Sequence, residues 1–174
     1  MTKKSTGIIL LLLIADFLFV QMTCGRRHCS NPETAQLTPY DNADSTPHTP
    51  GAAGVKATAF MLELNINFSD YICKRRTSLF VSQAYAGPAY YTPIDHVELT
   101  SDRNFDATHP AGSDLQDLFN HPNVSALNFY TPKTNFYLLH PPSDSGTHIF
   151  TIKIYTIDSG RTIITTAAPV KLTL

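Results

Sequence analysis

The sequence of 174 residues has no tryptophan, few charged side chains and no excess of charge of one sign. Charged residues make up 16% of the chain, and 13 lysines and arginines against 14 aspartates and glutamates leave a formal net charge of -1. Proteins that bind nucleic acid need a surplus of basic side chains to neutralise the phosphates. Nucleic acid is therefore not expected among the partners of this protein.

Sequence motifs of hydrolases and of metal centres are also absent. No Gly-x-Ser-x-Gly element presents a serine nucleophile, and no Cys-x-x-Cys or mixed Cys/His spacing suits zinc. Asp95 precedes His96, but neighbours on a strand point to opposite faces, so adjacency does not make them a catalytic pair. We expect a protein that is not an enzyme and uses no cofactor. A glycosidase with two distant carboxylates remains an alternative, because their separation is set by the tertiary structure.

Hydrophobic side chains are concentrated at the N-terminus, directly after Lys3 and Lys4. Residues 7–15 are apolar and residues 17–20 continue the pattern, but the run is too short to span a bilayer. These features predict an export signal over residues 1–23, which places the rest of the chain outside the cytoplasm. An uncleaved membrane helix is the alternative.

A cysteine follows this signal directly. Thr23, Cys24 and Gly25 resemble the cleavage site of bacterial lipoproteins, although Gln21 stands where that family usually has a leucine-like residue. The resemblance implies cleavage before Cys24, attachment of a palmitate-containing lipid to Cys24, and anchorage to a membrane. Ordinary cleavage a few residues further on, with loss of Cys24, is the alternative.

The remaining cysteines also bear on the compartment. Three cysteines in an exported chain leave one without a partner. Once Cys24 carries a lipid, Cys29 and Cys73 remain, and an oxidising compartment allows them to form a disulfide. Two free thiols are the alternative.

The composition changes at residue 54. Residues 24–54 are rich in proline, threonine, serine and asparagine, and Leu37 and Tyr40 are among the few side chains there that a core would bury. Such a composition predicts a flexible tether. The folded domain is expected over residues 55–174.

Alternation of apolar and polar residues predicts that this domain is all-β. The alternation is clearest over residues 55–68, 94–101 and 150–155, and it predicts that Leu64, Val97 and Ile152 are buried. Other expected strands are residues 77–85, 129–130 and 136–139, and a returning segment from Ile163 to Leu172 that the turn Asp158-Ser159-Gly160 joins to residues 150–155 in a hairpin.

A single short helix is expected over residues 113–119, because Ser113 and Gln116 have the spacing of a capping box. About seven strands with this helix favour an immunoglobulin-like β-sandwich over a closed barrel.

Two groups of residues are candidates for ligand contact. Tyr85, Tyr90 and Tyr91 predict an exposed aromatic patch that stacks on a sugar ring or a partner protein, with tyrosines at the edge of a core as the alternative.

Asp102, Asn104 and Asp106 have the first, third and fifth positions of a calcium loop. Ala107 stands where such a loop has glycine, and Ser113 where it has glutamate. We therefore expect these side chains to satisfy backbone groups of the loop rather than to hold a metal, with calcium as the alternative.

A second resemblance covers most of the chain after Phe60. The segments from Val97 to Asp106 and from His109 to Leu115, with the closing hairpin, resemble a family of small Bacteroidetes lipoproteins that has no assigned function. The resemblance implies a place in the cell envelope and no activity. Lipoproteins moved to the cell surface usually carry acidic residues after the lipidated cysteine, whereas residues 25–28 here are basic, which favours the periplasmic side.

The sequence therefore predicts a lipid-anchored interaction or structural module of the cell envelope with an unknown protein partner. The alternative is a glycan-binding accessory lipoprotein that uses Tyr85, Tyr90 and Tyr91.

Overall fold

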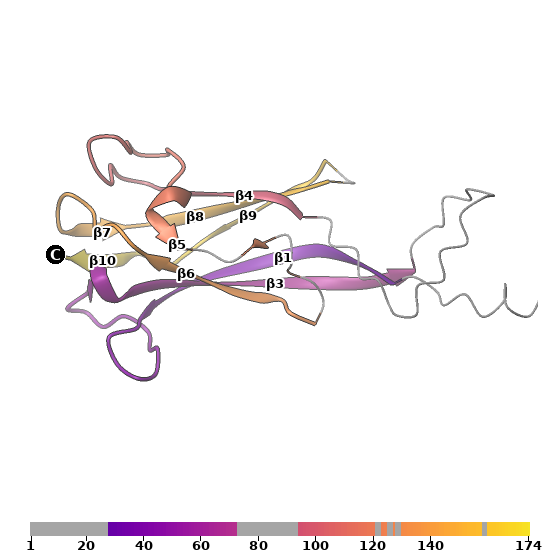
Figure 1. Cartoon of the computed structure of the whole chain (residues 1–174), viewed down its shortest axis with the longest axis horizontal. Coiled ribbons are helices and arrows are strands. Elements are labelled where there is room, and N and C mark those ends of the chain that lie inside the picture. The colour runs from indigo at the N-terminus through magenta and orange to yellow at the C-terminus, as the bar shows by residue number, and fades with distance from the viewer. Residues whose placement is uncertain (1–27, 73–93, 121–122, 125–126, 128–129, 158–159) are drawn as a thin grey trace, which may run out of the picture. The chain divides into compact units, whose positions relative to one another are not determined.

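The computed structural model describes residues 28–72, 94–120, 123–124, 127, 130–157 and 160–174 (Figure 1). Contacts divide the chain into two compact units, Met1–His28 with Ile72–Tyr90 and Cys29–Tyr71 with Tyr91–Leu174. The described residues of the second unit form an all-β structure with ten strands and two turns of 3₁₀ helix.

Four strands form the first sheet, in the order β1, β3, β6 and β5. Their bounds are β1 His28–Asp41, β3 Phe60–Ile72, β6 Lys133–Leu138 and β5 Phe119–Asn120. Antiparallel pairing places Leu62 of β3 opposite Phe136 of β6, and both side chains are fully buried. One face of this sheet therefore supplies one wall of the core.

The second layer contains β4 (Ile94–Ser101), β8 (Phe150–Thr156) and β9 (Thr162–Thr166), with β2 (Val55–Lys56), β10 (Val170–Thr173) and β7 (Gly146–His148) continuing it. Only one residue, Ile149, separates β7 from β8. The Ala167 N–H donates to the Phe150 carbonyl, which carries the ladder from the β8–β9 pair towards the β7–β10 pair. These four strands thus form one long hairpin, which confirms the predicted closing hairpin.

The packed sheets confirm the predicted all-β sandwich, with ten strands among the described residues where about seven were expected. The first layer has the order β1-β3-β6-β5, and the second begins with the short strand β2, which runs parallel to the C-terminal strand β10. Gly54 lets β2 approach β10, since its φ is 92° and a Cβ there would lie 2.6 Å from the Lys171 carbonyl oxygen. Figure 1 shows β1 and β3 in one layer and β4 and β8 in the other.

Part of the predicted tether is wrong, because residues 28–41 form strand β1 of the first sheet. Pro32, Leu37 and Pro39 are buried there. Proline can lie in an edge strand, and its ring is apolar, so two prolines take positions that the sequence analysis assigned to loop. Residues 42–54 are outside strands apart from a single bridge between Asp41 and His48.

The predicted helix over residues 113–119 is also wrong. Its place is taken by one turn of 3₁₀ helix, η2 (Gln116–Leu118), and a second such turn, η1 (Ala57–Ala59), precedes β3. Ser113 Oγ donates to the Pro110 carbonyl instead of capping a helix. The capping box does not form, because the Gln116 side chain donates a hydrogen bond to the Val97 carbonyl of β4.

Of the remaining predicted strands, residues 77–85 lie outside the described residues. Phe129 of the predicted strand 129–130 also lies outside them, and Tyr130 is 64% exposed and lies in a bend rather than in a strand. The other predicted strands correspond to β3, β4, β6 and β8, and β4 has the predicted bounds.

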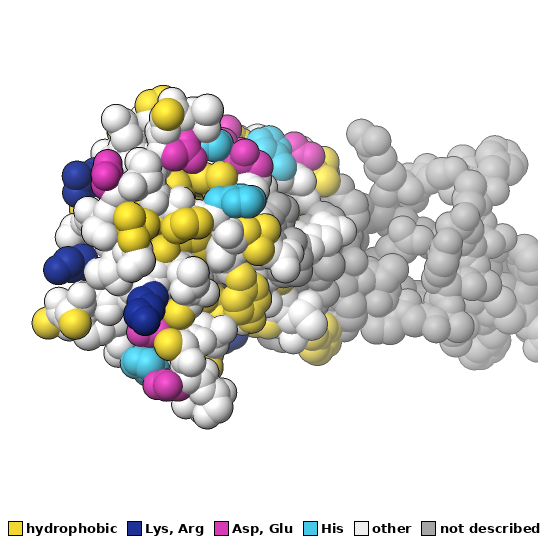
Figure 2. Space-filling model, turned by 60° about the vertical axis from the view of Figure 1, so that its left-hand side comes forward, with side chains coloured by type: hydrophobic (Ala, Val, Ile, Leu, Met, Phe, Trp, Pro, Cys, Tyr) yellow, Lys and Arg dark blue, Asp and Glu magenta, His cyan; other side chains and the backbone are white. Residues whose placement is uncertain are grey.

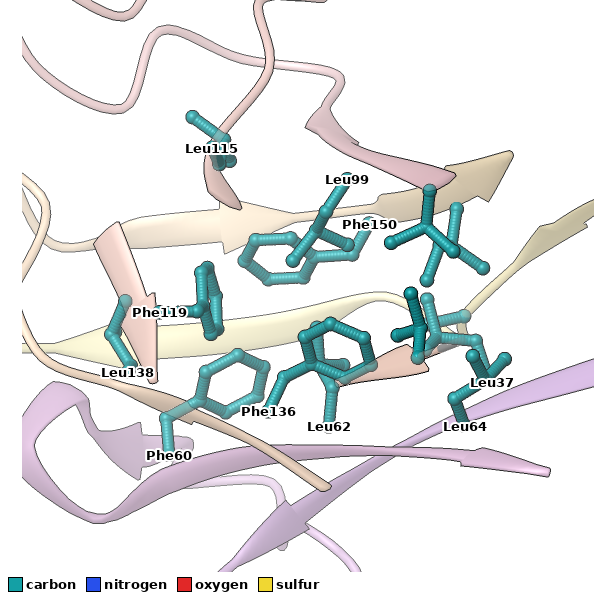
Figure 3. Packing of buried hydrophobic residues seen from close by; sticks show 14 of the residues in the cluster. Leu37, Phe60, Leu62, Leu64, Leu99, Leu115, Phe119, Phe136, Leu138 and Phe150 are labelled. Atoms are coloured by element: carbon teal, nitrogen blue, oxygen red, sulfur yellow. The ribbon is translucent and has the colours of Figure 1, made fainter. Parts of the chain in front are cut away.

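The core lies between the two sheets, where aromatic rings from both layers meet (Figure 3). Phe150 of β8 stacks on Phe60 of β3, with ring centroids 5.3 Å apart, and meets Phe119 of β5 edge to face at 6.1 Å. Leu64, Val97 and Ile152 are all 0% exposed, as predicted.

Replacement of Phe150 by alanine should lower the free energy of unfolding by about 3–5 kcal/mol, because it leaves a cavity between the sheets. Urea denaturation followed by circular dichroism measures this change. Ile164→Ala is the matched control, since Ile164 lies on the same hairpin but is 60% exposed. Its effect should stay within about 0.5 kcal/mol. Equal losses in the two variants would contradict the proposed position of the core.

Candidate interaction surface

The outer edge of β4 is covered by the segment that follows it. The Gly112 N–H donates to the Ser101 carbonyl at 2.8 Å, and the Leu115 N–H donates to the Leu99 carbonyl at 2.7 Å. A sheet edge normally leaves such groups free to pair with another chain. Here the protein's own backbone occupies them.

Two side chains complete this edge cover. Asp114 Oδ1 accepts the Leu99 N–H at 3.1 Å, and Gln116 Nε2 donates to the Val97 carbonyl. Gln116 Nε2 also donates to Asp114 Oδ2 at 3.0 Å, so the two side chains hold each other in place. The segment from Gly112 to Gln116, which we call the edge cover, thus pairs with the outer edge of β4 from Val97 to Ser101.

The outer edge of β1 is also obstructed. Pro39 has no N–H to offer, and Arg161 Nη2 donates to the Glu33 carbonyl at 3.1 Å. Asp41 exchanges both backbone hydrogen bonds with His48, at 2.8 and 3.0 Å. β2 and β5 contain only two residues each. Strand addition is therefore a poor route to a partner along the edges of β1, β2, β4 and β5.

Asp114→Ala should lower the free energy of unfolding by about 1 kcal/mol, because the Leu99 N–H loses its acceptor. Asp114→Asn keeps an oxygen at that position and should lose less. Urea denaturation measures both variants. Asp144→Ala, at an exposed position in another loop, is the control and should stay within about 0.5 kcal/mol of the wild type. A larger loss for Asp144→Ala than for Asp114→Ala would contradict the edge cover.

The solvent side of β4 and β8 carries a connected polar cluster. Glu98 Oε2 accepts hydrogen bonds from Tyr155 Oη at 2.9 Å and from Lys153 Nζ at 3.2 Å. The hydrogen bond from Tyr155 is the main cause that lowers the pKa of Glu98, and the bond from Lys153 lowers it further. The hydrogen bond between Tyr155 and Glu98 also raises the pKa of Tyr155. His96 stacks on the Tyr155 ring, with centroids 4.3 Å apart.

The expectation that Asp95 and His96 point apart is wrong. Asp95 Oδ2 lies 2.8 Å from His96 Nδ1 because a bulge between Ile94 and His96 breaks the alternation of the strand. Both side chains are more than half exposed, at 61% and 53%. With Glu98, Lys153 and Tyr155 they form a polar surface that we call the β4–β8 face.

The side chains of the candidate calcium loop accept hydrogen bonds from backbone N–H groups. Asp102 Oδ1 accepts the Ile149 N–H at 2.7 Å, and Asn104 Oδ1 accepts the Ala111 N–H at 2.9 Å. Asp106 Oδ1 accepts the N–H groups of Thr108 and His109. Each of the three side chains therefore has the role that the sequence analysis favoured. Among the described residues, no three histidine, cysteine, aspartate or glutamate side chains gather as a metal site.

A histidine between two carboxylates holds this loop against η2. His109 Nδ1 lies 2.9 Å from Asp106, and its Nε2 lies 3.2 Å from Asp117 Oδ2. The Asp106 carboxylate raises the pKa of His109. Hydrogen bonds from Thr108 in turn hold the pKa of Asp106 well below its usual value. The charged pair persists to lower pH than an unperturbed pair would.

The stability given by His109 should depend on pH. Because the folded pKa of His109 is raised, its contribution is complete below about pH 6.5 and is lost as pH rises through the folded pKa. Asp106 stays ionised well below pH 4, so His109→Gln should lower Tm most near pH 5–6 and least above pH 8.

Thermal melts of the wild type, of His109→Gln and of the exposed control His140→Gln across this pH range measure the effect. A difference in Tm for His109→Gln that stays constant with pH would refute the charged arrangement.

One hydroxyl–histidine pair lies inside the core. Ser101 Oγ is 3.0 Å from His148 Nδ1, and the two residues are 3% and 2% exposed. His148 stacks on Phe150 at 5.8 Å, and burial lowers its pKa. A neutral histidine in this position completes the core and satisfies Ser101. No substrate reaches a pair this buried.

Several predicted site residues lie outside the described residues. They are Cys24, Cys73, Tyr85, Tyr90 and Tyr91, and the side chain of Cys29 also belongs to this group. Lipidation, the disulfide and the tyrosine patch therefore stay predictions. No helix in the described ranges is both long and apolar enough to cross a membrane.

Comparison with known proteins assigns no relative. No family model, curated protein or solved structure matches the chain.

Figure 2 shows acidic, basic and histidine side chains interspersed with apolar ones on one face of the molecule. The β4–β8 face and the edge cover were both missed by sequence reasoning, because their partners lie 15 to 57 residues apart in the chain.

Proposed function

We propose that this protein is an exported, lipid-anchored module of the cell envelope that acts by binding or as a structural component, without catalysis or cofactor. The observation that carries the proposal is that the hydroxyl–histidine pairs among the described residues are unsuited to general-base catalysis. Ser101 and His148 are buried, and Thr108 lies 3.0 Å from His109, whose two nitrogens both face carboxylates. A histidine that holds protons on both nitrogens donates and cannot act as a base.

The exposed Asp95–His96 pair also supports a binding role. Within the described residues no hydroxyl is hydrogen-bonded to His96, whose ring lies on Tyr155. Aromatic side chains such as Tyr155 are enriched in protein contact surfaces, and polar side chains form the rim of such surfaces. The β4–β8 face is the surface we propose for the protein partner.

The sequence and the position at which β1 begins support the proposed anchor. Only three residues separate Cys24 from His28, the first residue of β1. A chain of that length spans at most about 15 Å. A lipid on Cys24 would therefore hold the start of β1 close to the membrane. The basic residues 25–28 can contact acidic headgroups there, and we propose the periplasmic side.

The mass of the intact membrane-extracted protein tests this proposal. We expect a chain that begins at Cys24 and carries added lipid, found in the membrane fraction. Cys24→Ser should lose the lipid and leave the membrane, whereas Cys29→Ser should keep both. A soluble wild-type product that begins after Cys29, or a wild-type chain with its first residues uncleaved, would contradict the anchor.

A further inference from the structure

The outer face of the first sheet contains a hollow of about 340 Å³. Thr34 and Gln36 of β1 line it on one side, and Asn65 and Asn67 of β3 line it on the other. It ends at Pro132, whose carbonyl accepts the Ile66 N–H at 2.9 Å. The hollow therefore lies on the face of the sheet, over hydrogen-bonded backbone, and is separate from the β4–β8 face.

The polar groups of this hollow are amides and a hydroxyl. Gln36, Asn65 and Asn67 each present an amide that can donate and accept at once. Within the described residues, these three amides make no recorded hydrogen bond with the protein, and Gln36 and Asn67 are exposed. A ligand with several hydroxyl groups matches this set, because each hydroxyl also donates and accepts.

The apolar part of the lining suits the other side of such a ligand. Ala35, Phe68 and Pro132 contribute to the hollow beside the amides. A sugar ring offers hydroxyls at its rim and C–H groups on its faces, so it can meet both kinds of surface. The volume is at the small end of ligand pockets, which fits one or two sugar units rather than a larger molecule.

The charges near the hollow indicate a neutral ligand. Lys133 lies opposite Asn65 on the neighbouring strand, but its Nζ is 3.1 Å from Glu63 Oε1. The two charges offset each other beside the hollow. None of the lining residues is acidic or basic. An acidic sugar would find no free cation among them.

We propose that this hollow binds a neutral sugar unit of a glycan, with Gln36, Asn65 and Asn67 as its hydrogen-bonding residues. A peptide is the competing ligand. Extended peptides gain affinity mainly by adding a strand to a sheet edge, and the hollow lies on a face whose backbone is already paired. The site does not depend on the lipid anchor or on the β4–β8 face.

The full chain, purified in detergent, should be tested on an array of neutral and acidic oligosaccharides built from glucose, galactose, mannose and N-acetylglucosamine. We expect retention of a neutral oligosaccharide, and titration calorimetry with that oligosaccharide then gives Kd. The double variant Asn65→Ala with Asn67→Ala should raise Kd at least tenfold. Gln36→Ala alone should raise it less, because it removes one amide.

Asn135→Ala is the matched control, since Asn135 lies on β6 of the same sheet and does not line the hollow. It should leave Kd unchanged, and thermal melts should show all variants folded. No retained neutral sugar would overturn the proposal, as would a Kd indifferent to the double variant. Loss of binding only in the double variant Tyr90→Ala with Tyr91→Ala would overturn the proposal and assign glycan binding to the tyrosines. Retention of peptides instead of sugars would overturn it by showing that the ligand is a peptide.

Discussion

The packing of Phe150 against Phe60 and Phe119 is the interaction on which the sandwich depends. Phe150 comes from the long C-terminal hairpin, and the other two rings come from strands of the opposite sheet. Phe105, from the loop after β4, and His148 lie on the same ring cluster. These rings therefore join both layers to the loop that carries His109. Aromatic side chains bury a large apolar area each, so this cluster contributes strongly to the core.

A sandwich stabilised in this way still leaves open edges, and the chain covers those of β4 and β1 with local devices of different kinds. At β4 the edge cover uses both backbone and side chains, and at β1 a proline, an arginine and a short bridge act separately. Free strand edges carry a risk of pairing with other chains and of aggregation. Because strand addition is obstructed at β4 and β1, the faces of the sheets are the surfaces there that can take part in recognition.

The sequence predicted the long strands whose buried residues are aliphatic or aromatic, and it missed β1, whose buried residues include proline, along with the short strands β5 and β7. Leu64, Val97 and Ile152 follow strict alternation, and all three lie in the core. β1 was read as a tether because Pro32 and Pro39 count as turn residues in any local pattern. The spacing of Ser113 and Gln116 was read as a helix cap, yet Gln116 bonds to Val97, 19 residues away. Local spacing cannot separate these uses, because one glutamine amide can accept from a backbone N–H at a helix cap or donate to a distant carbonyl.

The candidate sites differ in the same way. Asn104 and Asp106 could be interpreted from sequence, since short-range backbone bonding is the ordinary role of such residues in a loop, whereas Asp102 bonds to the Ile149 N–H, 47 residues away. The β4–β8 face joins Glu98 to Tyr155 across 57 residues, and the hollow joins β1 to β3, so neither has a local signature. The two surfaces also differ in chemistry. On the β4–β8 face the charged groups already bond to one another, whereas the amides of the hollow have no such partners in the described part of the chain. Groups satisfied within the protein favour a preformed surface for a protein partner, while unsatisfied amides gain most from a ligand rich in hydroxyls. That difference is why we assign the two surfaces to different ligands.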